Sequence, residues 1–199
     1  MKSYSVKKLI EGDWSAIPSV DILEKYLDTP ENVSATAKLA YDDEGFIVKL
    51  HTKEFEHRCV ENGPFGVPCE DCCLEFFFSP FEEDKRYFNI EFNSNGCMYL
   101  GIATSIDDLI RLVPEEENIF KPVIEKGENE WGIEYKIPTS FIKRFFPDFE
   151  IYEGKKIRAN FFKCADMTNP AHYLSWSKVD ESHFTFHQRE NFGLLTVVK

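Results

Sequence analysis

The sequence lacks any long apolar run. Its hydrophobic stretches are only a few residues long, whereas a helix needs about 20 apolar residues to cross a bilayer, so no membrane span is expected. The first residues, MKSYSVKKLIEGDW, also lack the apolar segment and the small-residue cleavage site of an export signal. As written, the sequence predicts a cytoplasmic protein, unless an export signal has been removed from it.

Positive charge is also scarce. The 199 residues include 23 lysines and arginines against 35 aspartates and glutamates, which gives a formal net charge of −12 at pH 7. Nucleic-acid phosphates and anionic lipids are bound through clusters of basic side chains, and no such cluster stands out here. A nucleic-acid or membrane partner is therefore not expected, and neutral or cationic ligands are favoured.

Paired metal-binding motifs are missing as well. The six cysteines stand at positions 59, 69, 72, 73, 97 and 164, and Cys69-x-x-Cys72-Cys73 has no second Cys or His pair at zinc-ribbon spacing. Free thiols and no cofactor are therefore expected. The acidic stretches 41–45, 81–85 and 114–118 fall where turns belong. They predict solvated loops, and a structural calcium ion is the alternative, which would require oxygens converging from separate loops.

Two neighbouring stretches alternate between polar and apolar residues. They are EDCCLEFFFS (70–79) and RYFNIEFNSN (86–95), and successive side chains of a strand point to opposite faces. Glu75 therefore shares a face with Asp71, and Glu91 shares a face with Asn89, while the intervening apolar residues are free to build a core. The linker SPFEEDK is short enough for a hairpin, which would merge the two polar rows. Such a patch suits a polar, uncharged ligand such as a sugar.

Strand-like segments also dominate the rest of the chain. They lie at about 3–9, 33–41, 45–52, 71–79, 86–94, 97–103, 129–137, 156–164, 172–177 and 193–198, separated by turn residues. Helical signals are confined to 18–27, with Ser19 as a candidate cap, and 139–146, with Thr139 or Ser140. No repeat or linker divides the chain. We predict a single all-β domain, residues 1–199, folded as a two-sheet antiparallel β-sandwich with one or two short helices.

The order of these segments resembles the carbohydrate-binding modules of family 9 and their stand-alone relatives. The resemblance is carried by Trp14 with Ile17-Pro18, EDCCLEFFFSP, RYFNIEFNSNG, WGIEYKIP, GKKIRANFFKC, YLSWS and FHQRENFGLLTV. It covers nearly the whole chain and implies a β-sandwich that holds sugars without cleaving them. Family members clamp a terminal sugar ring between two aromatics. The resemblance places one of these near Trp176 and the other near Cys69, where Phe65 is the nearest aromatic substitute.

We therefore predict a non-catalytic carbohydrate site on the polar sheet face, edged by Trp176. Its expected residues are Trp176, Glu75, Glu91, Asn89, Arg58, Arg158, Asn160, Phe65 and His187. Trp176 could equally be a core residue, and either arginine could simply neutralise the nearby acids. Trp131, in phase with Ile133, is expected in the core. Two other functions stay open: a glycoside-processing enzyme that uses Glu75 and Glu91 as its carboxyl pair, and an interaction domain that has lost sugar binding.

Overall fold

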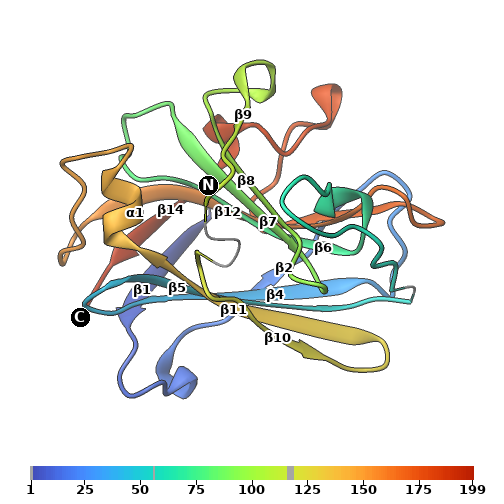
Figure 1. Cartoon of the computed structure of the whole chain (residues 1–199), viewed down its shortest axis with the longest axis horizontal. Coiled ribbons are helices and arrows are strands. Elements are labelled where there is room, and N and C mark those ends of the chain that lie inside the picture. The colour runs from blue at the N-terminus through green and yellow to red at the C-terminus, as the bar shows by residue number, and fades with distance from the viewer. Residues whose placement is uncertain (1, 56, 116–118) are drawn as a thin grey trace.

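The computed structural model describes residues 2–55, 57–115 and 119–199. These residues form 14 strands and one short α-helix, α1 (Thr139–Lys143), drawn in Figure 1. The strands are β1 (Ser3–Lys8), β2 (Val20–Ile22), β3 (Glu24–Tyr26), β4 (Ser34–Tyr41), β5 (Gly45–Lys53), β6 (Cys73–Ser79), β7 (Tyr87–Asn93), β8 (Met98–Ala103), β9 (Ile110–Arg111), β10 (Val123–Lys126), β11 (Glu130–Pro138), β12 (Lys156–Ala165), β13 (His172–Ser175) and β14 (Gly193–Val197). Short 3-10 helices span Trp14–Ala16, Pro68–Glu70, Ile106–Asp108, Glu181–His183 and Arg189–Asn191. None of the described helices is long and apolar enough to cross a bilayer.

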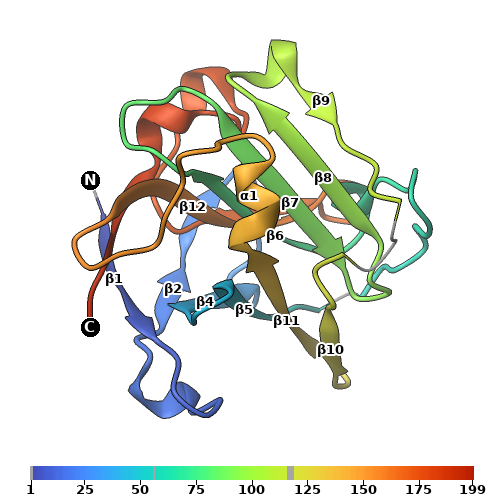
Figure 2. The same ribbon diagram turned by 60° about the vertical axis from the view of Figure 1, so that its left-hand side comes forward.

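The strands form one curled sheet that folds back on itself, as Figures 1 and 2 show. Its main path runs β10-β11-β5-β4-β1-β14-β12-β6-β7-β8-β9, with β2 beside β4, β13 beside β12 and β3 beside β13. Strand β1 joins the two halves because it runs parallel to β14 through one part of its length and parallel to β4 through the other. The all-β prediction is confirmed, but the two-sheet antiparallel arrangement is not, because the strands form one continuous, mixed sheet.

Sequence patterning predicted the main strands well. All ten predicted segments contain a strand, and the strands that it missed are β2, β3, β9 and β10, which are only two to four residues long. The predicted helix at 18–27 is wrong, because this segment forms β2 and β3, which pair with β4 and β13. Helix α1 lies where a helix was expected, but its N-cap is Pro138 and neither Thr139 nor Ser140 caps it.

The main hydrophobic core fills the space between the two halves of the curled sheet. Rings from opposite halves meet there, with Phe92 and Tyr135 centred 4.9 Å apart and Phe46 and Phe78 6.2 Å apart. Trp131 is fully buried in this core, which confirms its prediction. Because the inner face of every central strand contributes large side chains, β6, β7, β12 and β13 are held as a rigid platform.

A second, smaller core covers part of the opposite, outer face of this platform. The segment 178–192 crosses that face, and the Phe186 ring stacks on Phe162 of β12 at 4.2 Å. Gln188 fastens the segment, since its Nε2 donates to the carbonyls of Asp180 and His183, both at 2.9 Å. The polar rows of β6 and β7 are buried instead of being an open wet surface, partly beneath this segment and, at Asn93, by contacts with Glu61 and Asp71.

The acidic turns pair with basic side chains. Lys136 Nζ lies 2.6 Å from a carboxylate oxygen of both Asp42 and Glu44 in the first stretch, and Arg86 pairs with Asp84 at 2.6 Å in the second. The third stretch, 114–118, includes residues 116–118, which lie outside the described residues. In the first two stretches Asp42, Glu44 and Asp84 thus lie in partly exposed surface ion pairs.

Candidate binding site

The hairpin of β6 and β7 brings two carboxyl groups together, as the alternation predicted. The register pairs Glu75 directly with Glu91, and Phe77 with Asn89. On the other side of β6, strand β12 places Phe162 opposite Glu75, and β13 then places Tyr173 opposite Cys164. Directly paired residues of adjacent strands project to the same face. Glu75, Glu91, Cys164 and Tyr173 therefore share the outer face.

A cavity of about 300 Å³ opens on this face between the strands and the segment 178–192. Its floor is built by strand residues, and its rim by β13 and two loops. The lining residues are Cys69, Glu75, Phe77, Glu91, Cys164, Asp166, Tyr173, Phe184, Thr185, Phe186 and His187. They include three carboxyl groups but no lysine or arginine, so the cavity disfavours an anionic ligand.

The two central carboxyl groups are buried with part of their hydrogen-bonding capacity unused. Glu75 is 2% exposed, and its Oε1 accepts a hydrogen bond from Cys164 Sγ at 2.8 Å. Glu91 Oε1 accepts from Asn89 Nδ2 at 2.9 Å. Among the described residues, no partner reaches Oε2 of either glutamate. A ligand that offers hydroxyl groups would satisfy these oxygens, which are otherwise costly to bury.

The surroundings shift the ionisation of these groups. Burial, followed by the neighbouring charge of Glu91, raises the pKa of Glu75 well above its usual value. Burial also raises the pKa of Glu91 to about 7, although its hydrogen bond from Asn89 acts in the opposite direction. A protonated carboxyl can donate a hydrogen bond as well as accept one. The pair can therefore match both the donor and the acceptor character of a sugar hydroxyl.

His187 and the aromatic rim complete the cavity. His187 Nδ1 lies 2.8 Å from the Tyr87 hydroxyl, and burial lowers the pKa of this histidine to about 4, so its ring is neutral at pH 7. Tyr173 and Phe184 are half-buried at the rim, with their rings edge to face and 5.2 Å apart. Aromatic faces of this kind stack against the apolar C–H face of a sugar ring.

Trp176 does not edge this face, and its predicted position is wrong. It is 3% exposed and packs in the main core, where its ring lies 5.7 Å from that of Phe161. The ring also fills the space above Gly193, where an added Cβ would lie 2.3 Å from Trp176. In β13 the residues alternate, so Leu174 and Trp176 face inward, and the outward aromatic residue is Tyr173.

The structure also separates both predicted arginines from the glutamate pair. Arg58 forms an ion pair with buried Asp71, whose other carboxylate oxygen accepts the backbone N–H groups of residues 60 and 61. Arg158 pairs with Glu82 at 3.2 Å and lies opposite Ser79, four residues along β6 from Glu75. Neither arginine lines the cavity. Both carry out the neutralising role that the sequence had left open.

The remaining predicted residues divide in a similar way. The side-chain amide of Asn160 is hydrogen-bonded to the backbone of Ser177. Its Nδ2 donates to the Ser177 carbonyl and its Oδ1 accepts from the Ser177 N–H, both at 2.8 Å. Phe65 is 73% exposed and does not line the cavity. Asn89 donates a hydrogen bond to Glu91 from the same face of β7, and His187 lines the cavity directly. The structure therefore brings together Glu75, Glu91, Asn89 and His187.

Sequence reasoning missed the residues that complete the site. Asp166 follows β12, and Phe184 lies in the segment 178–192. Cys69, near which the resemblance placed a clamp residue, does line the cavity, from a short 3-10 turn. Such loop residues leave no periodic signal. Tyr173 did leave one, because its alternation with the apolar Leu174 and Trp176 predicts that it faces outward with Ser175.

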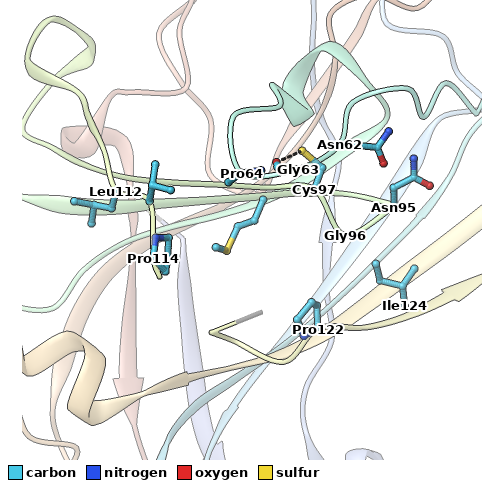
Figure 3. A pocket seen from close by; sticks show the side chains of 12 residues that line it. Asn62, Gly63, Pro64, Asn95, Gly96, Cys97, Leu112, Pro114, Pro122 and Ile124 are labelled. Carbon is cyan, nitrogen blue, oxygen red and sulfur yellow. Dashed lines mark hydrogen bonds between the residues drawn. The ribbon is translucent and has the colours of Figure 1, made fainter. Parts of the chain in front are cut away.

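A second cavity, shown in Figure 3, differs in its chemistry. It has a volume of about 440 Å³ and is lined by Asn62, Gly63, Pro64, Asn95, Gly96, Cys97, Met98, Leu112, Val113, Pro114, Pro122 and Ile124. These lining residues include no aromatic ring and no charged side chain. The cavity therefore lacks the stacking surface and the carboxyl groups that the outer-face cavity offers to a sugar.

The fold is shared with solved structures. A protein from Bacteroides uniformis ATCC 8492 that is proposed to bind carbohydrate superposes with a TM-score of 0.84 at 26% identity, covering 98% of this chain and 99% of its own. A family 9 carbohydrate-binding module from Caldicellulosiruptor kristjanssonii is similar at 12% identity. Its complex with cellotriose gives a TM-score of 0.68 and covers 99% of this chain and 94% of that one. Its complex with glucose gives 0.67, with 98% and 95% covered.

Sequence comparison identifies the family directly. No curated protein matches the chain. The family model described as carbohydrate-binding family 9 matches residues 6–197, which is almost the whole length. This match confirms the resemblance that the order of the sequence motifs suggested. The chain belongs to carbohydrate-binding family 9.

Proposed function

We propose that this protein binds a mono- or oligosaccharide non-covalently in the outer-face cavity and does not cleave it. The observation that carries the proposal is the buried pair Glu75 and Glu91, in a cavity of about 300 Å³ rimmed by Tyr173 and Phe184. Each glutamate has one oxygen that no described residue reaches. Membership of a carbohydrate-binding family and the sugar complexes of a structural neighbour support it.

The rim aromatics and the carboxyl groups would contact different parts of a pyranose. Its C–H face is apolar and would stack on the half-buried rim aromatics, whereas its hydroxyl groups would bond to the carboxyl groups below. A typical neutral hydrogen bond contributes only about 0.5–1.5 kcal/mol net. Because the cavity carries a few such groups and not an extended platform, it fits one sugar unit at the end of a chain with modest affinity.

Cleavage of the sugar is disfavoured by the placement of the two glutamates. A glycosidase holds its acid and its nucleophile or base on either side of the scissile bond. Glu75 and Glu91 are instead direct neighbours on adjacent strands of one sheet, so both approach a ligand from the same side. We therefore assign the pair to binding.

Isothermal titration calorimetry with a panel of sugars tests the proposal, starting with glucose and cello-oligosaccharides and extending to other neutral hexoses and pentoses. The key variants are Tyr173→Ala and Glu91→Gln. Tyr152→Ala is the matched control for the first, because Tyr152 is 59% exposed and does not line the cavity. Glu134→Gln on β11 is the control for the second.

We expect Tyr173→Ala and Glu91→Gln each to weaken binding about tenfold, which corresponds to about 1.4 kcal/mol, and the controls to leave it unchanged. Absence of heat with every sugar would contradict the proposal and favour an interaction domain that has lost sugar binding. Turnover of chromogenic glycosides that disappears in Glu91→Gln would contradict the non-catalytic assignment.

A further inference from the structure

Three potential metal ligands meet beneath the outer-face cavity. One ligand atom each from Cys73, Glu75 and Cys164 lie within 4.8 Å of one another. Cys73 and Cys164 are directly paired residues of β6 and β12, and Glu75 follows Cys73 by two positions, so all three project to the same face. The grouping was not visible in the sequence, because Cys164 stands 91 positions after Cys73.

The spacing of the three atoms suits a tetrahedral metal. With Zn–S bonds of about 2.3 Å, two thiolates on one zinc ion lie about 3.8 Å apart. The three side chains are at most 2% exposed, so little solvent competes with them. Cys164 and Glu75 both line the cavity, which leaves the fourth coordination position open toward it.

The cluster also lacks a compensating cation. Oε2 of Glu75 is buried and has no hydrogen-bond partner among the described residues, and the cavity around it carries two more carboxyl groups but no basic lining residue. Outside the lining, Arg111 acts on Glu91, and Lys163 acts on Glu75 only weakly, from the inner face. A divalent ion bound at this position would give Glu75 Oε2 a direct positively charged partner.

We propose that Cys73, Cys164 and Glu75 form a binding site for a thiophilic divalent cation, for which zinc is the probe. Two sulfur ligands and one oxygen favour zinc over calcium or magnesium, which prefer all-oxygen sites. Binding would displace the thiol protons of both cysteines, and any proton on the Glu75 carboxyl group, to solvent. Burial raises the pKa of Cys73 to about 12 and that of Cys164 well above its usual value, so the ion must compete with these protons.

A second group of potential metal ligands is the alternative site. Ligand atoms of Glu54, Cys72 and His172 also lie within 4.8 Å of one another. There, however, Lys163 Nζ already lies 2.9 Å from Glu54 Oε2 and supplies the cationic charge. A metal ion would have to displace this buried ammonium group, so we assign the ion to the outer cluster.

The test is a titration of the reduced, chelator-treated full-length protein with Co²⁺, followed by displacement with Zn²⁺. We expect one equivalent of Co²⁺ to produce a thiolate-to-cobalt charge-transfer band and the visible bands of tetrahedral cobalt, and Zn²⁺ to abolish both. Cys164→Ser should weaken Zn²⁺ binding by at least about 100-fold. Cys97→Ser is the matched control, since Cys97 is also buried but bonds to Gly63 elsewhere, and it should leave binding unchanged.

Two further variants, Glu75→Gln and Cys72→Ser, test which residues bind the ion. Glu75→Gln is nearly isosteric, so it should fold even if Cys164→Ser does not, and it should also weaken Zn²⁺ binding. Absence of a thiolate band, or its loss in Cys72→Ser while Cys164→Ser retains it, would overturn the proposal. The metal titration needs no sugar, and the sugar titrations are run on metal-free protein, so the two proposals can fail independently.

Discussion

Buried carboxyl groups lie against both faces of β12, and their surroundings differ. On the inner side, Glu54 accepts from Lys163 Nζ at 2.9 Å and from Trp131 Nε1 at 2.8 Å, and its carboxylate lies 3.2 Å from His172 Nε2. On the outer side, Glu75 has one short contact with a thiol, and its other oxygen has no hydrogen-bond partner within the described part of the chain. All of these groups are almost completely shielded from water.

The pKa values follow this difference. Burial alone would raise the pKa of Glu54, but the charge of Lys163 and the hydrogen bonds around it hold that pKa at about 2. Glu75 experiences the same burial without a close cation, and its pKa rises well above the usual value. A buried carboxyl group that is fully paired stabilises the fold, whereas one that is left unpaired is available to a ligand. The contrast therefore assigns Glu54 to stabilising the fold and Glu75 to binding a ligand.

Removing the inner cation should have the largest effect. In Lys163→Met, Glu54 would lose its counter-charge in a fully buried site. We expect the free energy of unfolding to fall by about 3–5 kcal/mol, as when one partner of a buried ion pair is removed. Urea denaturation followed by circular dichroism measures this change.

The control for this variant is Lys49→Met. Lys49 pairs with Glu134 at 3.4 Å, and both side chains are more than one-third exposed, so a loss of at most about 1 kcal/mol is expected. Equal losses in the two variants would show that the inner cluster is no more important than a surface pair.

A change in pH should weaken the same cluster by a smaller amount. The folded-state pKa of Glu54 is about 2 and lies below the unfolded value of 4.5. Its contribution of about 3 kcal/mol is therefore present above about pH 4.5 and is lost as the pH falls toward 2. We expect the stability difference between the wild type and Glu54→Gln, measured by urea denaturation, to shrink between about pH 5 and about pH 3. A difference independent of pH would contradict this assignment.

The sequence predicted the outer face better than the inner one. Strict alternation in β6 and β7 was enough to place Glu75 and Glu91 on the same face of neighbouring strands, and the structure adds that the two residues pair directly. The inner cluster gave no such signal. Glu54 follows the end of β5, and Lys163 occupies an inward position of β12 where the pattern would favour an apolar residue.

The errors have a common physical origin. Trp176 was assigned to the site by the family resemblance and Arg158 by its residue type. The phase of β13, however, turns Trp176 inward, and the register of β12 carries Arg158 to the far end of β6. The loop that closes the cavity could not be predicted, since Phe184 is positioned by tertiary packing against Tyr26 and Tyr173 and not by any local period. Element type was thus predictable from local pattern, while the complete site required the tertiary arrangement.

Glu75→Gln should change the free energy of unfolding least among these variants. In Glu75→Gln, an amide replaces the carboxyl group that already has an unpartnered oxygen, and no cation loses a partner on the outer face. We expect the free energy of unfolding of the metal-free protein, measured in the presence of a chelator, to change by less than about 1 kcal/mol. The matched inner variant, Glu54→Gln, should cost several times more, because it leaves Lys163 buried without its counter-charge. A large loss in Glu75→Gln would mean that the outer carboxyl group holds the fold together as the inner one does, and the distinction between a structural and a ligand-binding face would fail.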